Sequence, residues 1–238
     1  TFIFFALEAA IMALALQMVL DVPLAWCYAL SAVVVIPLVT HGITLISRLQ
    51  LWTQPLWLLL FALPFLALAF VNPQAYGALA GLRGSVSGSS GFDPLMFGAA
   101  ATVASSLVVQ IGEQVDYLRF LPEKTRENRW RWWSAVVVAG PGWVVPGMLK
   151  MLAGALLASL ALERGVAPEQ AVQPTEMYLG AFEQAIGHPG TALAVMVVFV
   201  IVSQMKINVP TAYAGSLAWS NFSARLTHSH PGRVVWLV

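Results

Sequence analysis

Cysteine and charged residues are both scarce in this chain of 238 residues. Cys27 is the single cysteine, so no disulfide can form within the chain. Charged residues make up 10% of the sequence, against about 25% in soluble proteins. The net charge of +1 gives no electrostatic reason to expect nucleic acid as a partner. A disulfide-rich scaffold and a charge-rich disordered chain are therefore excluded.

Hydrophobic residues, in contrast, are abundant. They make up 59% of the chain, against roughly 45–50% in soluble proteins, and the mean hydropathy is +0.77. A soluble fold of this size cannot bury so many apolar side chains, so the excess must face lipid. We therefore expect an all-α, polytopic membrane protein. Because apolar runs lie at both ends of the chain, we interpret it as an internal piece of a longer protein.

Apolar runs near 20 residues long predict the membrane spans. Polar residues or Pro and Gly clusters separate these runs. We treat residues 1–238 as one partial transmembrane domain. Its expected spans are 1–20, 24–46, 55–71, 95–115, 134–162 and 189–222, and a further span starts at 234.

The distribution of Lys and Arg among the expected loops predicts the orientation. Cytoplasmic loops of membrane proteins carry the excess of basic residues. The loops after the second, fourth and sixth spans hold Arg48, Arg119, Lys124, Arg126, Arg129, Arg131, Arg225 and Arg233, whereas the other loops hold only Arg83 and Arg164. We therefore expect Thr1 on the cytoplasmic side of a bacterial inner (plasma) membrane.

Polar residues inside the spans are the candidates for function, because they are costly in lipid. Phe4 and Glu8 lie one turn apart, which suits a flat heterocycle that stacks on the ring and donates hydrogen bonds to the carboxylate. A structural pairing of Glu8 with a lysine is the alternative. Gln110 lies in a span interrupted by Gly and Ser, the kind of discontinuous helix at which transporters bind substrates.

The sixth span carries Ser203, Lys206 and Pro210 on one helix face. Pro210 has no N–H and so leaves the carbonyl of Lys206 without its usual helical donor. An ammonium near this point can take the place of a sodium ion. The alternative is a lysine that reaches the lipid headgroups. No metal site and no enzyme activity are expected, because the histidines lack ligand spacing and no catalytic motif is present.

Three segments resemble the nucleobase–cation symporter-1 family, which comprises the cytosine, uracil, allantoin and hydantoin permeases. VDYLRF is similar to its Asp-aromatic-x-Arg-aromatic signature, KINVPTAYAGSLAWSNF to its eighth helix, and FFALEAAIMA to its third. The resemblance covers most of the chain. It implies the inverted-repeat, leucine-transporter-type helical bundle, of which the six complete spans would be helices three to eight.

The resemblance also implies roles for individual residues. Lys206 departs from the small hydroxyl residues usual in the family. The resemblance therefore does not decide whether transport is coupled to sodium, to protons or to no ion. The implied assignments are a stacking ring at Phe4, a substrate-binding carboxylate at Glu8, a polar substrate contact at Asn208 or Thr211, a share of the sodium site at Ser203 and Lys206, and a cytoplasmic gate at Asp116 and Arg119.

The function expected from these features is transport of a nucleobase or related small heterocycle by alternating access. No cofactor is expected, and the expected partners are the lipid bilayer and the substrate. The alternative is a permease-like sensory domain of a larger signalling protein of the histidine kinase type. In that case a downstream signalling domain would be a further partner.

The predicted orientation can be tested by cysteine labelling in a Cys27→Ser background. We expect Asn128→Cys to react with an impermeant thiol reagent only from the cytoplasmic side, and Ser87→Cys only from outside. The reason is the concentration of basic residues in the loops expected on the cytoplasmic side. Labelling of both positions from one side would contradict the assignment of spans.

Overall fold

The computed structural model describes residues 2–81, 91–108, 111–229 and 232–236, and these residues form helices and turns without a β-strand. The chain divides into two compact units. The first unit comprises residues 1–76 and 156–238, and the second comprises residues 77–155.

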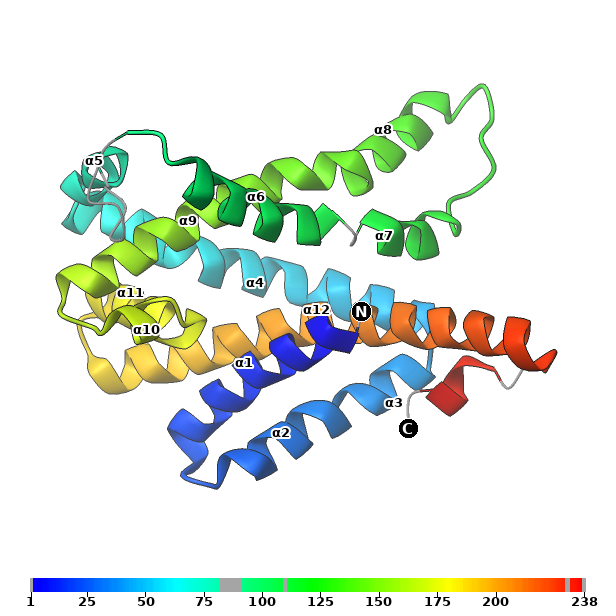
Figure 1. The fold of residues 1–238 in the computed structure, drawn as a ribbon, viewed down its shortest axis with the longest axis horizontal. Coiled ribbons are helices and arrows are strands. Elements are labelled where there is room, and N and C mark those ends of the chain that lie inside the picture. The colour runs from blue at the N-terminus through cyan, green and yellow to red at the C-terminus, as the bar shows by residue number, and fades with distance from the viewer. Residues whose placement is uncertain (1, 82–90, 109–110, 230–231, 237–238) are drawn as a thin grey trace. The chain divides into compact units, whose positions relative to one another are not determined.

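The first unit is built around α12 (Pro189–Thr227), which has 39 residues. His188 caps its start, because the Nδ1 atom accepts a hydrogen bond from the Thr191 N–H at 3.3 Å. In Figure 1, α1 lies along the first half of α12 and runs in the opposite direction. The helices that pack directly on α12 are α1 (Phe2–Leu20), α3 (Val35–Thr40), α4 (Ile43–Val71) and α11 (Pro174–Ile186), together with the short helix η2 (Arg233–Trp236).

Two smaller helices complete the first unit. α2 (Leu24–Val33) packs against α1 and α3, and α10 (Pro168–Ala171) packs against α11. Arg164 Nη1 lies 3.4 Å from Glu183 Oε2, so an ion pair joins the segment after α9 to α11. α2 and α10 therefore extend the helical bundle that α12 organises.

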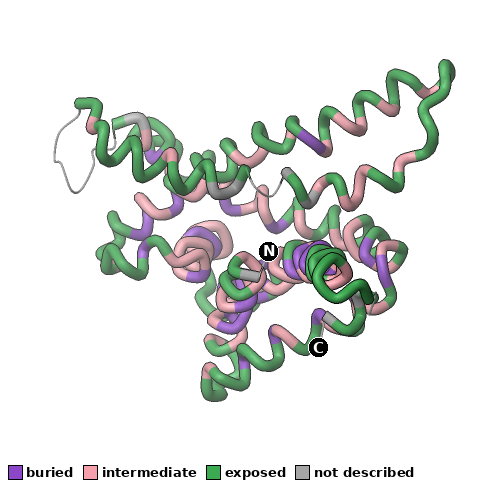
Figure 2. The backbone as a smooth tube through the Cα atoms, turned by 45° about the vertical axis from the view of Figure 1, so that its right-hand side comes forward, coloured by how far each residue is buried: buried purple, intermediate pink, exposed green. Residues whose placement is uncertain are grey.

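The core of the first unit lies between α1, α4, α11 and the first half of α12. Phe182 and Met196 are completely buried there, and Ala15 and Leu60 contribute from α1 and α4. The ring centroids of Tyr178 and Phe199 are 4.6 Å apart. Burial raises the pKa of the Tyr178 phenol. Figure 2 shows that buried residues gather where these helices meet.

The second unit is also built from helices. Asp93 caps the start of α6 (Pro94–Val108), because its Oδ1 atom accepts hydrogen bonds from the N–H groups of Leu95 at 2.9 Å and Met96 at 3.1 Å. The helices that lie wholly within the second unit are α6, α7 (Ile111–Leu118), α8 (Arg129–Ala139) and η1 (Pro141–Trp143). Two further helices, α5 (Gln74–Ala80) and α9 (Val144–Glu163), belong partly to each unit.

The structure confirms an all-α membrane protein. Among the described residues, four helical segments are long and apolar enough to cross a bilayer: Ile3–Leu20, Ile43–Val71, Pro141–Glu163 and Pro189–Thr227. They correspond to the first, third, fifth and sixth expected spans. Leu24–Thr40 and Pro94–Ser105 are shorter apolar helices at the second and fourth.

The boundary between the second and third expected spans differs from the prediction. The helical part of the second expected span, α2 and α3, ends at Thr40 instead of residue 46, because Gly42 adopts a φ of 79° that turns the chain. α4 then begins at Ile43 and continues through Pro55, which was expected to start the span. The polar residues 47–54, expected as a loop, are therefore helical, and Arg48 lies within α4.

The fifth expected span, 134–162, is interrupted. α8 ends at Ala139, and α9 starts at Val144. Pro141 disfavours helical backbone at Gly140, and a Cβ atom at Gly140 would lie 2.6 Å from the carbonyl oxygen of Val136. In the fourth expected span the structure describes α6 and α7. The segment 163–187, between the fifth and sixth expected spans, contains α10 and α11, and η2 lies where a further span was expected to start.

Candidate functional site

The contact between α4 and α12 contains a reciprocal pair of hydrogen bonds. The Gln50 side-chain amide donates through Nε2 to the main-chain carbonyl of Lys206. In return, Lys206 Nζ donates to the main-chain carbonyl of Gln50 at 3.0 Å and to Thr53 Oγ1 at 3.3 Å. Pro210 explains the first bond, because it has no N–H with which to donate to Lys206. The Gln50 amide supplies the donor that the proline removes.

A second cross-helix bond lies one turn away. Trp57 Nε1 donates to Ser203 Oγ at 2.9 Å. The Trp57 ring stacks on Phe61 with centroids 5.2 Å apart and an interplanar angle of 11°. We call Gln50, Thr53, Trp57, Ser203 and Lys206 the α4–α12 junction. It brings together both residues that the sequence placed in an ion or ion-replacing site.

The junction places the Lys206 side-chain nitrogen among oxygen atoms. The Lys206 ammonium contacts one main-chain carbonyl and one hydroxyl, which are the kinds of ligand that hard metal cations take. All of the junction side chains are half-buried. An ammonium in this position donates hydrogen bonds to oxygen atoms on α4.

Another side of α12 carries polar groups of a different kind. Asn208 is completely buried, and neither its Oδ1 nor its Nδ2 atom has a hydrogen-bond partner among the described residues. Gln204, one turn earlier, has a buried Oε1 atom in the same condition. A buried polar group without a partner costs about 1–3 kcal/mol. A ligand that bonded to these amides would recover that cost.

Helix α1 brings the other expected substrate residues to the same part of α12. Phe4 and Glu8 are half-buried on α1. Ala15 shares a core cluster with Met196, and α1 runs antiparallel to α12 (Figure 1). With a helical rise of about 1.5 Å per residue, the first two turns of α1 lie at the level of residues 203–208. The three expected substrate residues of the first unit thus lie along one helix pair.

The expected cytoplasmic gate lies in the second unit. Asp116 is on α7, and Arg119 follows the end of that helix. Burial raises the pKa of the Asp116 carboxyl, and the Arg119 guanidinium opposes this rise. The Arg119 Cζ atom lies 5.0 Å from the Phe120 ring centroid, and no ion pair joins it to Asp116 in the described part of the chain. Gln110 lies outside the described residues.

The sequence reasoning missed four residues of the site: Gln50, Thr53 and Trp57 on α4, and Gln204 on α12. The first three repeat at helical spacing, so they share one face. That periodicity is the sequence signal for them, whereas the polarity of residues 47–54 favours a loop. Gln204 lies four residues before Asn208, which is also the spacing of one face. No group of three His, Cys, Asp or Glu side chains in the described residues is arranged to hold a metal.

The junction predicts that Pro210→Ala reduces the loss of stability caused by Gln50→Leu. Gln50→Leu should lower the free energy of unfolding by about 1–3 kcal/mol, because it removes the donor to the Lys206 carbonyl. In a Pro210→Ala background the same substitution should cost less, because the alanine N–H supplies the helical donor. Chemical unfolding in detergent measures both values.

Gln54→Leu is the matched control for this prediction. Gln54 is exposed on the same helix, so its replacement should change stability little in either background. An equal cost of Gln50→Leu with and without Pro210 would contradict the assignment of the amide as a substitute donor.

Comparison with known proteins leaves the function to the chemistry of these residues. A scan of protein-family models, a search of curated proteins and a search of solved structures each found no match to this chain.

Proposed function

We propose that this chain is the substrate-binding part of a permease for a nucleobase or a related small heterocycle, with an inverted-repeat, leucine-transporter-type bundle. Its sequence resemblance to the nucleobase–cation symporter-1 family motivates the proposal. The packing of α1 on α12 supports it, because these helices carry Phe4, Glu8 and Asn208. Alternating access of the site across the membrane would then move the substrate.

The observation that carries the proposal is the buried amide of Asn208. Its side chain has no exposed surface and no hydrogen-bond partner among the described residues. Native proteins pair nearly all buried polar groups, so an exception calls for an explanation. A substrate that hydrogen-bonds to this amide is the explanation we adopt.

The chemistry of an amide matches the edge of a heterocycle. Asn offers one acceptor oxygen and two N–H donors. Purine and pyrimidine edges present donors and acceptors side by side, and an Asn amide can pair with them through two parallel hydrogen bonds. A carboxylate at Glu8 would accept from a further ring N–H, and the Phe4 ring would stack on the face of the heterocycle.

The position of Lys206 suggests which ion, if any, is coupled to substrate binding. Its ammonium already contacts the Gln50 carbonyl and the Thr53 hydroxyl. We propose that this tethered charge replaces a sodium ion, so substrate binding does not require sodium. A change in the protonation of Lys206 during transport would couple substrate to protons instead.

Asn208→Leu separates a substrate-binding role from a structural one. Leucine has a similar size and removes two unpaired polar atoms, so thermal stability should stay equal or rise. Affinity for the preferred member of a nucleobase and hydantoin panel should fall about fivefold or more, because about 1–3 kcal/mol of hydrogen bonding is lost. Calorimetry of the full-length protein measures the affinity, and a thermal melt in detergent measures the stability.

The same measurements apply to two residues of α1. Glu8→Gln and Phe4→Ala should each weaken binding, whereas Glu169→Gln and Phe70→Ala, at exposed positions, should not. A fall in melting temperature for Asn208→Leu with unchanged affinity would return the amide to a structural role. Binding without uptake into proteoliposomes would identify a sensory domain in place of a transporter.

The tethered charge predicts sodium-independent binding. Affinity of the full-length protein should be equal in sodium chloride and in choline chloride at constant ionic strength. Lys206→Ala should impair binding or make it depend on sodium, because the oxygen atoms of α4 then lose their cation. Lys150→Ala is the matched control, since Lys150 Nζ lies over the Trp143 ring at 5.1 Å in the second unit. Wild-type affinity that rises strongly with sodium would overturn the idea.

A further inference from the structure

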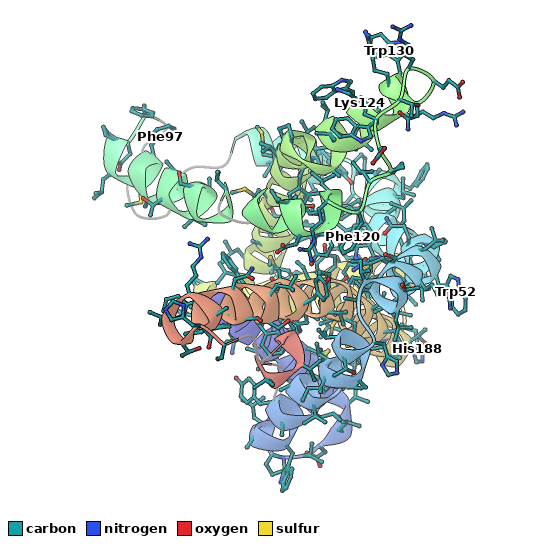
Figure 3. The ribbon with its side chains drawn as sticks, turned by 90° about the vertical axis from the view of Figure 1, so that its right-hand side faces the viewer. Trp52, Phe97, Phe120, Lys124, Trp130 and His188 are labelled. Carbon is teal, nitrogen blue, oxygen red and sulfur yellow. The ribbon has the colours of Figure 1, made fainter. Side chains whose placement is uncertain are left out.

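The turn between α7 and α8, together with the start of α8, forms a basic and aromatic surface. Its cationic side chains are all exposed. Trp130 is 78% exposed and Trp133 is 45% exposed. In Figure 3, Trp130 projects from the end of α8, with Lys124 on the adjoining turn. We define the basic–aromatic surface as Lys124, Arg126, Arg129, Arg131, Trp130, Trp132 and Trp133.

Contacts within the surface hold several of these groups in place. Lys124 Nζ lies 5.4 Å from the Trp132 ring and 5.2 Å from the Trp133 ring, and the two rings meet edge to face. Trp132 Nε1 donates to the Pro122 carbonyl at 3.0 Å. Arg129 Cζ lies 5.6 Å from the Trp130 ring. Lys124 and Arg129 are therefore held against preformed aromatic rings.

Basic side chains outnumber acidic ones at this surface. Residues 121–133 contain four basic side chains and two acidic ones, Glu123 and Glu127. None of the four cations forms an ion pair within 4.0 Å in the described part of the chain, where Arg164 and Glu183 form one. The surface thus complements an anionic partner.

Exposed apolar residues follow the surface along α8. From Arg131 to Val138 the helix rises about 10 Å. Val137 is 51% exposed and Val138 is 69% exposed, and the apolar segment Pro141–Glu163 follows. Cations and tryptophans at one end of a helix, followed by exposed valines, match the transition from headgroups to hydrocarbon.

We propose that the basic–aromatic surface binds the headgroups of anionic phospholipids in the adjacent leaflet. Phosphate oxygens would contact the arginines and Lys124, and the exposed indole of Trp130 would lie among the headgroups. Basic groups next to a membrane segment attract anionic lipids in this way. A soluble acidic protein or a nucleic acid would not require the tryptophans and valines that continue the surface toward the membrane.

The test uses the purified full-length protein in a neutral detergent. A short-chain fluorescent phosphatidylglycerol and the matching phosphatidylcholine are titrated, and fluorescence anisotropy gives both affinities. We expect tighter binding of phosphatidylglycerol, which weakens as salt is added. Arg129→Gln with Arg131→Gln should weaken phosphatidylglycerol binding about fivefold or more and leave phosphatidylcholine binding unchanged.

Two paired variants make the outcome specific. Arg48→Gln with Arg225→Gln removes the same charge from exposed positions outside the surface and should keep the affinity. Arg129→Lys with Arg131→Lys keeps the charge and should stay within about twofold of the wild type, even if the glutamine pair does not fold. No preference for phosphatidylglycerol in the wild type, an equal loss in the Arg48 pair, or tighter binding of a fluorescent oligonucleotide would each overturn the proposal.

Discussion

Pro210 removes a main-chain donor from the middle of the longest helix, and the packing of α4 on α12 compensates for that loss. Within a bilayer, backbone polar groups must find partners inside the protein. The Gln50 amide bonds to the carbonyl of Lys206, and the Lys206 ammonium bonds back to the carbonyl of Gln50. Because each residue uses both its side chain and its main chain, the exchange defines the register of the two helices. The core around Phe182 and Met196 then packs on this helix pair.

Because α4 contacts only one side of α12, the two sides of α12 differ in their hydrogen bonding. Ser203 and Lys206 point toward α4 and have partners there. Gln204 and Asn208 lie roughly 140° around the helix, at about 100° per residue, and contain buried atoms without partners in the described residues. One side therefore stabilises the helix pair, and the other holds buried amide atoms to which the described residues offer no hydrogen bond. This separation allows Asn208 to be tested without disturbing the junction.

The second unit presents its polar groups at a surface. The cations of the basic–aromatic surface are exposed, and Lys124 and Arg129 lie over tryptophan rings. Apolar residues of α8 follow the surface along the chain. Aromatic rings are suited to this place, because they contact cations, headgroups and hydrocarbon. The positive charge that predicted the orientation of the chain from its sequence is, in the structure, a surface with a defined arrangement.

The sequence by itself determined that the chain is an all-helical membrane protein, because its apolar side chains exceed what a fold of this size can bury. It also determined where α1 ends, before Asp21 and Pro23, and that Lys206 and Asn208 were unusual within an apolar span. The extent of α4 was decided only by tertiary structure, since residues 47–54 suit a loop in water equally well as a helix with polar partners on α12. The partner of Lys206 lies 156 positions away in the chain, and the isolation of the Asn208 amide depends on the helices packed around it. Contacts between residues so far apart in the chain depend on how the helices pack, and local sequence does not determine that packing.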